Sequence, residues 1–321
     1  MKFRITLLIA LFFLSHPASA ACLNLDFGSV PSLAAFQGGN GGYSVYENGE
    51  YLQTVSFTVQ AEAAGGICEY FVALSAGQSN DFSQRVLSDG INTLNYNAWV
   101  SADKTGILKE PPNATDEEVV KGTFSLIPGL EQTNEHEFVW TIDPAQIVPA
   151  SDMPYEDTSL TLSLYSGLPL FAPTFVTSRT ITFRARVESS VDLSLVDSGA
   201  PFDIGNTTQS VDFGTLESGE QLAFDLIIRS NSGYAVTMQS ENNQTLLHAS
   251  SAVTGRIVYD LLIDGASVDL SSGAPVQVLS DTVTTPATGI VFPVEFSIET
   301  LTGREAAGTY SDVITVDVTA N

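Results

Sequence analysis

Few side chains in this sequence of 321 residues have the type and spacing that catalysis or metal binding requires. Of its three histidines, His136 and His248 lie outside the first 20 residues, and neither has the HExxH spacing of a zinc hydrolase. No GxSxG nucleophile elbow occurs. The glycine-rich run at 38–42 lacks the lysine and helix of a phosphate-binding loop, and the acidic run at 116–118 lacks the alternating ligands of a calcium loop. The sequence therefore predicts no catalytic residue, no metal site and no cofactor.

The sequence contains two cysteines, Cys22 and Cys68. A basic start, an apolar run at 5–14 and a small-x-small site at 18–20 predict a secretory signal peptide over residues 1–20. The apolar run is shorter than the roughly 20 residues of a membrane-spanning helix. Because an exported chain meets an oxidising compartment, we expect a Cys22–Cys68 disulfide, with two free thiols as the alternative.

The charge balance excludes one class of partner. The chain has 12 Lys and Arg against 37 Asp and Glu, a formal net charge of −25. Nucleic-acid binding depends on basic side chains that neutralise phosphates, so no nucleic acid is expected as a partner. With 44% hydrophobic residues, the chain is too apolar for a disordered acidic tail and long enough for two domains.

Alternating apolar and polar residues dominate the rest of the sequence. The segments 55–59, 180–183 and 314–318 alternate with period two, which is typical of half-buried strands. Turn-forming clusters such as 88–90 and 230–233 separate such segments, and no long segment has a helical period. We therefore expect an all-β protein built of immunoglobulin-like β-sandwiches.

The two halves of the sequence repeat each other. Four motifs recur in the same order, pairing 25–28 with 211–214, 69–74 with 233–238, 94–99 with 257–262, and 174–183 with 309–316. The repeat predicts two tandem sandwiches, over residues 21–187 and 188–321. Whether 191–195 completes the first sandwich or begins the second stays open at this point.

Several of these motifs are shared with a known family. Phe27-Gly28, Cys68, the segment 94–96 and the closing run at 308–316 resemble the spore coat protein U domain, a family that includes the pilins of archaic chaperone–usher pili. Two-domain members of that family resemble tip adhesins, with an adhesin-like domain followed by a pilin-like domain. The resemblance implies a periplasmic chaperone, an outer-membrane usher and an adjacent pilin subunit as partners. It also implies export through the periplasm to the pilus tip at the cell surface, and a role in attachment and biofilm formation.

The two ends of the sequence fit this resemblance. In donor-strand pilins the last strand is missing, and a neighbouring subunit fills the resulting groove with an extended segment. Only three residues follow the alternating segment 311–318, so we expect the second sandwich to lack its final strand and to line a donor-strand groove with Tyr310, Ile314, Val316 and Val318. Cys22 closely follows the expected cleavage site, so we expect no segment that donates a strand. The alternative is that 313–318 is the last strand of a complete sandwich.

Three apolar loops are candidates for a surface-binding site. We expect the loops 166–177, 76–92 and 29–51 to meet at the far end of the first sandwich and to bind an abiotic or host surface. Their candidate binding residues are Leu168, Leu170, Phe171, Phe175, Phe36, Tyr43 and Phe82. The alternative for each residue is that it fills the open end of the core. Trp99 and Trp140 lie in strand-like segments, which favours core packing over sugar binding.

Two other functions remain alternatives. A free-standing secreted β-sandwich, either a binding module or a coat structural protein, would fold without a chaperone or a donated strand. A hydrolase would need one of the many possible carboxylate pairs, but no spacing singles out a pair. The sequence therefore favours a non-enzymatic pilus-tip adhesin.

Overall fold

The computed structural model describes residues 22–37, 42–46, 49, 52–62, 66–126, 129–250 and 255–321. The regular secondary structure of the described chain is almost entirely β-strand, and its single helical turn is a 3-10 turn, η1 (Gly77–Ser79). This confirms the all-β prediction. Within the described ranges, no helix is long and apolar enough to cross a membrane. The expected signal peptide lies outside the described residues, as does most of the glycine-rich run at 38–42.

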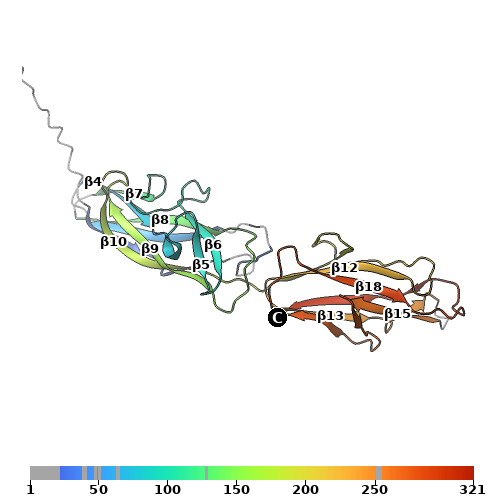
Figure 1. Cartoon of the computed structure of the whole chain (residues 1–321). Helices are drawn as coiled ribbons and strands as arrows, with labels where there is room; N and C mark the ends of the chain where they lie inside the picture. The colour runs from blue at the N-terminus through green and yellow to red at the C-terminus, as the bar shows by residue number, and fades with distance from the viewer. Residues whose placement is uncertain are drawn as a thin grey trace, which may run out of the picture.

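The strands form two sandwiches that lie end to end (Figure 1). The first sandwich consists of β1 (Leu23–Ser29), β2 (Leu33–Ala35), β3 (Leu52–Glu62), β4 (Gly66–Leu74), β5 (Arg85–Ser88), β6 (Thr93–Trp99), β7 (Val120–Leu126), β8 (Glu131–Ile142), β9 (Tyr155–Ser166) and β10 (Thr174–Ala185). The second sandwich consists of β11 (Val191–Asp197), β12 (Gln221–Ser230), β13 (Tyr234–Ser240), β14 (Thr245–His248), β15 (Arg256–Ile263), β16 (Ala266–Val268), β17 (Val276–Asp281), β18 (Ile290–Ile298), β19 (Tyr310–Ser311) and β20 (Ile314–Ala320).

The first sandwich is a continuous hydrogen-bonded path of strands folded around one core. The path runs β1-β3-β8-β6-β5-β9-β10-β2, and β4 pairs with both β7 and β9. β5 and β9 share a single register pair, Ser88 with Glu156, where the path passes from one layer to the other. Aromatic rings fill the space between the layers: Phe183 of β10 stacks on Trp140 with ring centroids 4.7 Å apart, and Tyr96 packs edge-on against Trp140.

Strand β10 completes the first sandwich. It pairs antiparallel with β9 along most of its length and parallel with the short strand β2. From Ile181 to Ala185 its side chains alternate between the core and the outer face, and Ile181 and Phe183 are fully buried. β10 therefore fills the gap between β9 and β2 and contributes its apolar side chains to the core.

The second sandwich has two separate sheets. One has the order β11-β12-β18-β15-β14-β19, with β16 added to β15, and the other has the order β17-β13-β20. β11 pairs with β12 from Val191 with Ser230 to Asp197 with Phe224. This pairing settles the question left open by the sequence: the segment 191–195 belongs to the second sandwich.

Corresponding strands of the two sandwiches show where they differ. β20 pairs with β13 as β9 pairs with β4, so β20 is the counterpart of β9. Among the described residues, the second sandwich has no counterpart of β10, and the outer edge of β20 carries no strand. This agrees with the expectation that the second sandwich lacks its final strand.

The same pairing corrects two of the four sequence repeats. The motif 174–183 lies in β10, whereas 309–316 lies in β19 and β20, so these segments are not equivalent strands. The motif 25–28 lies in β1, but 211–214 follows β11 without forming a strand, and the counterpart of β1 is β11. The other two repeats match β4 with β13 and β6 with β15. The paired motifs are alike because both alternate apolar and polar residues. Such alternation does not distinguish one strand of a sandwich from the next.

The two sandwiches meet at a polar junction around Asn231, which is fully buried. Its side-chain amide donates to the carbonyl oxygen of Glu188 (2.8 Å), and its side-chain oxygen accepts from the backbone N–H of Ser190 (2.7 Å). Its backbone carbonyl accepts from the N–H of Ala150 (2.8 Å). Beside it, the guanidinium of Arg229 in the second sandwich lies over the ring of Tyr46 in the first. The junction therefore joins the sandwiches by more than the linking chain.

Candidate functional site

A groove of about 1050 Å³ opens into the core of the second sandwich. It lies beside β20, at the position that β10 occupies in the first sandwich. Apolar side chains from both sheets form its floor, among them Phe224, Met238, Ile257, Val294 and Phe296. The missing strand thus exposes part of the apolar core along the edge of the sandwich.

One wall of the groove is β20. Ile314, Val316 and Val318 face the core and are half-buried, while the residues between them are exposed. β20 pairs along its length with β13, from Ile314 with Ser240 to Ala320 with Tyr234. No other described strand pairs with it. The backbone edge of β20 that faces the groove is therefore available to a further strand.

The opposite wall is an extended segment, 209–213, that follows β11. Gln209, Val211 and Phe213 are half-buried, and the residues between them are exposed. This alternation is that of a strand, yet the segment belongs to no sheet of the described chain. In the first sandwich, the segment after β1 contains β2, which pairs with β10. Residues 209–213 therefore have the pattern of a strand whose partner is missing.

The four residues predicted for a donor-strand groove lie together on this side of the second sandwich. Tyr310, Ile314 and Val316 line the groove, and Val318 packs against the same core from the same face of β20. Sequence reasoning missed the wall at 209–213 and the groove-lining loop 305–309. The available signal was the period-two alternation of 209–213. The sequence repeat instead pairs 211–214 with 25–28, which lie in β1.

The charged side chains that line the groove are all acidic. They are Asp212, Glu305 and Asp312, and no basic side chain is among the residues that line it. Hydrogen bonds from the backbone and side chain of Thr302 lower the pKa of Glu305 to about 2, so this carboxylate stays ionised at neutral pH. An occupant of the groove would therefore meet an apolar floor and a negative potential.

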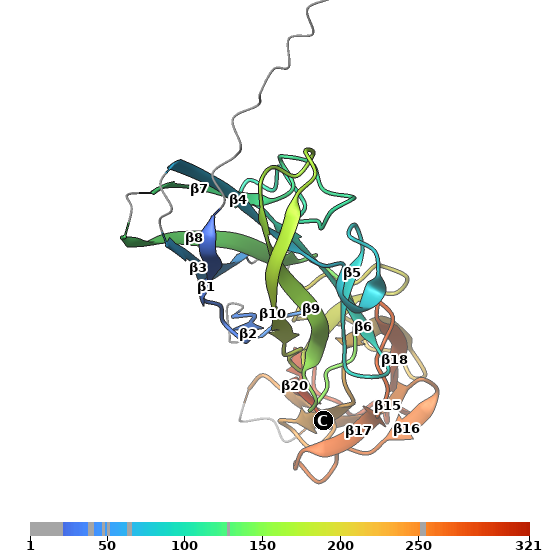
Figure 2. The same ribbon diagram turned by 90° about the vertical axis from the view of Figure 1, so that its left-hand side faces the viewer.

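A second candidate site is the far end of the first sandwich, which we call the apolar pole. The turns β7–β8 and β9–β10 and the start of β4 lie there, as the pairings Gly66 with Leu126 and Tyr70 with Ser166 require. Figure 2 looks onto this end. The exposed apolar side chains of the apolar pole are Leu23, Ile67, Leu130, Leu170, Phe171 and Phe175.

Three of the predicted surface-binding residues are exposed at the apolar pole. Leu170 and Phe175 are exposed, and Phe171 has 74% of its surface accessible. Leu168, at the start of the same turn, is half-buried. Leu23, Ile67 and Leu130 are not among the predicted residues, because each is a single apolar residue at or near the start of a strand and has no distinctive local pattern.

The structure corrects the prediction for the other three surface-binding residues, Phe36, Tyr43 and Phe82, none of which is exposed. Phe36 and Tyr43 are 4% and 3% exposed; Phe36 packs against Trp140, and the hydroxyl of Tyr43 donates to the Asp143 carbonyl oxygen. Phe82 is half-buried under the guanidinium of Arg85. None of the three belongs to the apolar pole.

The reason for this error is the direction of the strands that precede these loops. The expectation that the loop 76–92 lies at the far end requires the strand that begins near Cys68 to run towards that end. Instead β4 pairs antiparallel with β9, so it runs away from the apolar pole, from Gly66 to Leu74. The loops 76–92 and 29–51 therefore follow strands that run towards the second sandwich.

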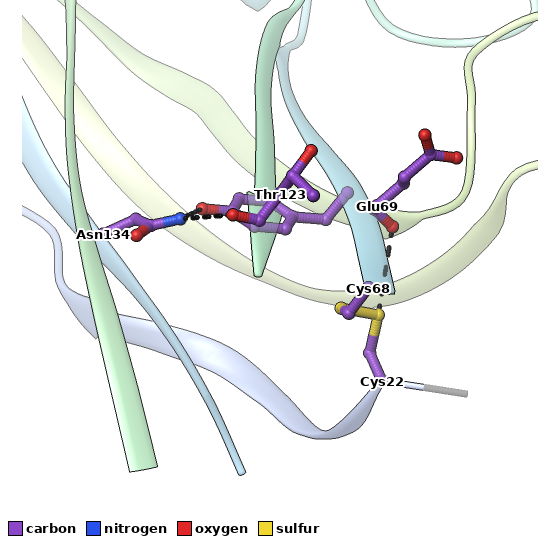
Figure 3. Close-up of a disulfide and its surroundings, with 6 residues drawn as sticks. Cys22, Cys68, Glu69, Thr123 and Asn134 are labelled. Carbon is purple, nitrogen blue, oxygen red and sulfur yellow. Dashed lines mark hydrogen bonds between the residues drawn. A yellow bond between two sulfur atoms is a disulfide. The ribbon is translucent and has the colours of Figure 1, made fainter. Parts of the chain in front are cut away.

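The Cys22–Cys68 disulfide is present, which confirms the prediction, and it lies at the apolar pole (Figure 3). It joins the residues next to Leu23 and Ile67, both exposed. The backbone carbonyl of Glu69 accepts a hydrogen bond from the N–H of Gly167 (2.9 Å) in the β9–β10 turn. The disulfide and this bond connect three segments of the apolar pole.

Polar residues close the sandwich just behind the apolar pole. The hydroxyl of Tyr70 lies 2.7 Å from Nε2 of His136. The same hydroxyl accepts from the side-chain amide of Asn134, which also donates to the backbone carbonyl of Thr123; Asn134 and Thr123 are labelled in Figure 3. Burial raises the pKa of Tyr70 to about 12 and lowers the pKa of His136. His136 is thus held neutral in a structural contact.

The remaining candidates for chemistry lie apart. Trp140 is fully buried, and the indole N–H of Trp99 donates to the Thr141 hydroxyl (3.1 Å). Within the described ranges, no three His, Cys, Asp or Glu side chains are grouped so that they could hold a metal ion.

Comparisons with known proteins give structural neighbours only. No family model matches the sequence, and no curated protein matches it. The chain is similar to a structure of the CsuC–CsuE chaperone–tip adhesion subunit pre-assembly complex from archaic chaperone–usher Csu pili of Acinetobacter baumannii (TM-score 0.42, 15% identity, 90% of this chain and 99% of that one). It is also similar to the CupB6 tip adhesin from Pseudomonas aeruginosa (TM-score 0.35, 11% identity, 92% of this chain and 94% of that one). A third similar structure is a chaperone–tip adhesin complex of CFA/I fimbriae (TM-score 0.38, 12% identity, 91% of this chain and 97% of that one).

Proposed function

We propose that this chain is the tip adhesin of a chaperone–usher fibre. The second sandwich accepts a strand from the next subunit, and the first sandwich binds a surface through the apolar pole. The observation that carries the proposal is the groove beside β20, which has an apolar floor and an unpaired strand edge. An exposed edge of this kind invites another strand, so a secreted protein needs a partner that covers it.

The first sandwich indicates how the partner strand would lie. There β10 runs antiparallel to β9 and parallel to β2. By the same geometry, the incoming strand would run antiparallel to β20 and parallel to 209–213, with hydrogen bonds to both. Its inward side chains would be apolar at every second position, because they replace the contacts that Ile181 and Phe183 make in the first sandwich.

The apolar pole supports the adhesive half of the proposal. Six exposed apolar side chains at one end of a soluble β-protein are typical of an interaction surface. They lie on the end of the first sandwich that faces away from the second, so a subunit bound at the groove would leave them accessible (Figure 1). An apolar surface, abiotic or on a host, is the chemistry that they would bind.

The remaining assignments follow from this role. A periplasmic chaperone would cover the groove before assembly, the outer-membrane usher would bring in the adjacent pilin subunit, and the chain would reach the cell surface at the pilus tip and support biofilm formation. The domain limits 21–187 and 188–321, and a non-enzymatic function, are part of the same proposal.

Strand acceptance is tested with the chain's own completing strand as the probe. A synthetic peptide with the sequence of residues 174–187 is added to the full chain, and binding is measured by calorimetry and by the shift in the melting temperature of the second sandwich. We expect saturable binding and a higher melting temperature, because the peptide buries apolar side chains worth about 1.5–3 kcal/mol each. A scrambled peptide of the same composition is the control. Equal behaviour of the two peptides would contradict the proposal.

Adhesion is tested by retention of the full chain on polystyrene beads. The triple variant Leu170→Ser, Phe171→Ser, Phe175→Ser should lose most of its retention. A matched triple variant changes three exposed valines of the second sandwich, Val258→Ser, Val283→Ser and Val291→Ser. This variant should stay on the beads as well as the parent chain does. If both variants lose retention equally, binding is a general property of exposed apolar residues and the apolar pole is not the site.

A further inference from the structure

The chain passes from one sheet of the second sandwich to the other just before the groove. β19 (Tyr310–Ser311) pairs with β14, and β20 (Ile314–Ala320) pairs with β13 in the other sheet. Only Asp312 and Val313 separate the two strands. Whatever fixes these two residues also fixes where β20 starts.

The carboxylate of Asp312 accepts four hydrogen bonds at this point. One oxygen accepts from the hydroxyl of Ser240 and from that of Tyr259, both at 2.6 Å. The other oxygen accepts from the backbone N–H of Asn242 (3.0 Å) and from that of Val313 (2.8 Å). Hydrogen bonds to an ionised acceptor are shorter and about twice as strong as neutral ones.

The donors come from both sheets. Ser240 is the last residue of β13, Asn242 lies in the turn that follows it, and Tyr259 lies in β15 of the opposite sheet. Burial raises the pKa of Tyr259, and the Asp312 carboxylate raises it further, so the hydroxyl stays protonated and donates. Asp312 thus links the end of β13 to β15 across the mouth of the groove, which it also lines.

We propose that Asp312 is a positioning residue that sets the register of β20 against β13, and with it the set of side chains that face the groove. Ser240 is the register partner of Ile314, so the bond from Ser240 to Asp312 holds β20 at its first pair. A slip of one residue would turn Ile314, Val316 and Val318 outward and bring Thr315, Asp317 and Thr319 into the groove. This assigns a role to the closing Gly-Thr-Tyr-Ser-Asp run at 308–312, and it rests on the proposed strand acceptance.

Register is measured directly by cross-linking in the full chain. Thr237 and Asp317 are register partners and both lie on the outer face of the sheet, so the variant Thr237→Cys, Asp317→Cys should form a disulfide across the two strands. Adding Asp312→Ala should lower the yield of this disulfide at least fivefold. Asp312→Asn, which keeps one acceptor oxygen, should restore part of it. Asp260→Asn, at an exposed aspartate beside Tyr259, should leave the yield unchanged.

The effect on strand acceptance is measured with the peptide of residues 174–187. Asp312→Ala, in the chain without added cysteines, should weaken peptide binding at least tenfold, and Asp260→Asn should not. If Asp312→Ala keeps both the 237–317 disulfide and the peptide affinity of the parent, the proposal is overturned, even if its melting temperature falls.

Two milder variants cover the case in which Asp312→Ala does not fold. Tyr259→Phe and Ser240→Ala each remove one donor and leave the carboxylate in place, and each should lower the cross-linking yield in part. Unchanged yields in both overturn the proposal. If the parent chain does not bind the peptide at all, strand acceptance fails, but the cross-linking yields still decide the role of Asp312.

Discussion

The two sandwiches share an order of strands but differ in how completely they bury their cores. In the described part of the first sandwich, 33 buried apolar residues form the main core cluster and five more pack against it half-buried. In the described part of the second sandwich the main core cluster has 15 buried apolar residues, and 16 more pack against it half-buried. The half-buried set of the second sandwich includes Val211, Phe213, Ile314 and Val316, which surround the position of the missing strand.

This difference shows what one strand contributes to such a fold. β10 supplies Ile181 and Phe183 to the core of the first sandwich and hydrogen bonds to strands on both sides. Without a counterpart, the second sandwich keeps its two sheets but leaves apolar surface and a strand edge open. This difference fits the proposed roles, in which the first sandwich carries the binding surface and the second receives a partner.

The largest expected effect comes from truncating one inward side chain in each sandwich, Phe183 of β10 in the first and Val316 of β20 in the second. Phe183→Ala should destabilise the first sandwich by about 3–5 kcal/mol, because it removes a fully buried ring that stacks on Trp140. Val316→Ala should cost the second sandwich less than about 1 kcal/mol, because this side chain is only half-buried while the groove is open. Guanidinium unfolding of the full chain, followed by separate probes in each sandwich, measures both.

The peptide of residues 174–187 sharpens this comparison. With the peptide bound, Val316 becomes a core residue, and the cost of Val316→Ala should rise towards that of a buried valine. A cost that is already large without the peptide would mean that the second sandwich is closed in solution.

The next effect concerns the disulfide, which only the first sandwich contains. Cys22→Ala with Cys68→Ala should lower the stability of the first sandwich by about 2–4 kcal/mol, because the two cysteines are 46 residues apart and the bond restricts the unfolded chain. The unfolding midpoint of the second sandwich should not move. A parallel loss in both sandwiches would show that they unfold as one unit and that their stabilities cannot be compared separately.

A smaller effect is expected at the junction. Asn231→Ala removes the side-chain hydrogen bonds to the backbone of Glu188 and Ser190 and leaves these half-buried backbone groups without that partner, which costs about 1–3 kcal/mol. The distance between spin labels at positions 84 and 315, one on each sandwich, should be narrowly distributed in the parent chain and broad in the variant. Asn113→Ala, at an exposed asparagine, is the control. Equal distributions would mean that the linking chain alone sets the orientation of the sandwiches.

Much of the fold could be predicted from the sequence, because period-two alternation reports burial directly. Alternation located the strands around 55–59, 180–183 and 314–318, and the predicted signal peptide together with an isolated cysteine pair was enough to expect the disulfide. The order of strands was harder. Alternation in 174–183 and in 309–316 is the same whether a strand lies in the middle or at the edge of a sheet, so the equivalent strands were matched wrongly.

The candidate sites were predictable to different degrees for the same reason. The groove residues Ile314 and Val316 lie on one strand, so one correct strand placed them together. The apolar pole depends on the direction of several strands. A wrong neighbour for β4 brought in Phe82, and a wrong placement of the loop after β1 brought in Phe36 and Tyr43. Strand pairing between distant parts of the chain brings three more residues to the end where the apolar turn 168–171 lies: Leu23, Ile67 and Leu130. No local sequence pattern indicates such pairing.

The smallest expected effect is a pH dependence of the first sandwich that comes from His136. Burial lowers the pKa of His136 in the folded chain below its usual value of 6.5. Protonation therefore favours the unfolded chain, so the stability present above pH 6.5 decreases as the pH falls through 6.5 towards the lowered folded value. Tyr70, whose pKa is raised to about 12, stays neutral throughout this range and keeps its contact with the ring. Unfolding of the first sandwich measured from pH 8 to pH 5.5 should show this loss, and His136→Gln should reduce it. The same slope in both proteins would mean that carboxylates, and not His136, set the acid sensitivity of the first sandwich.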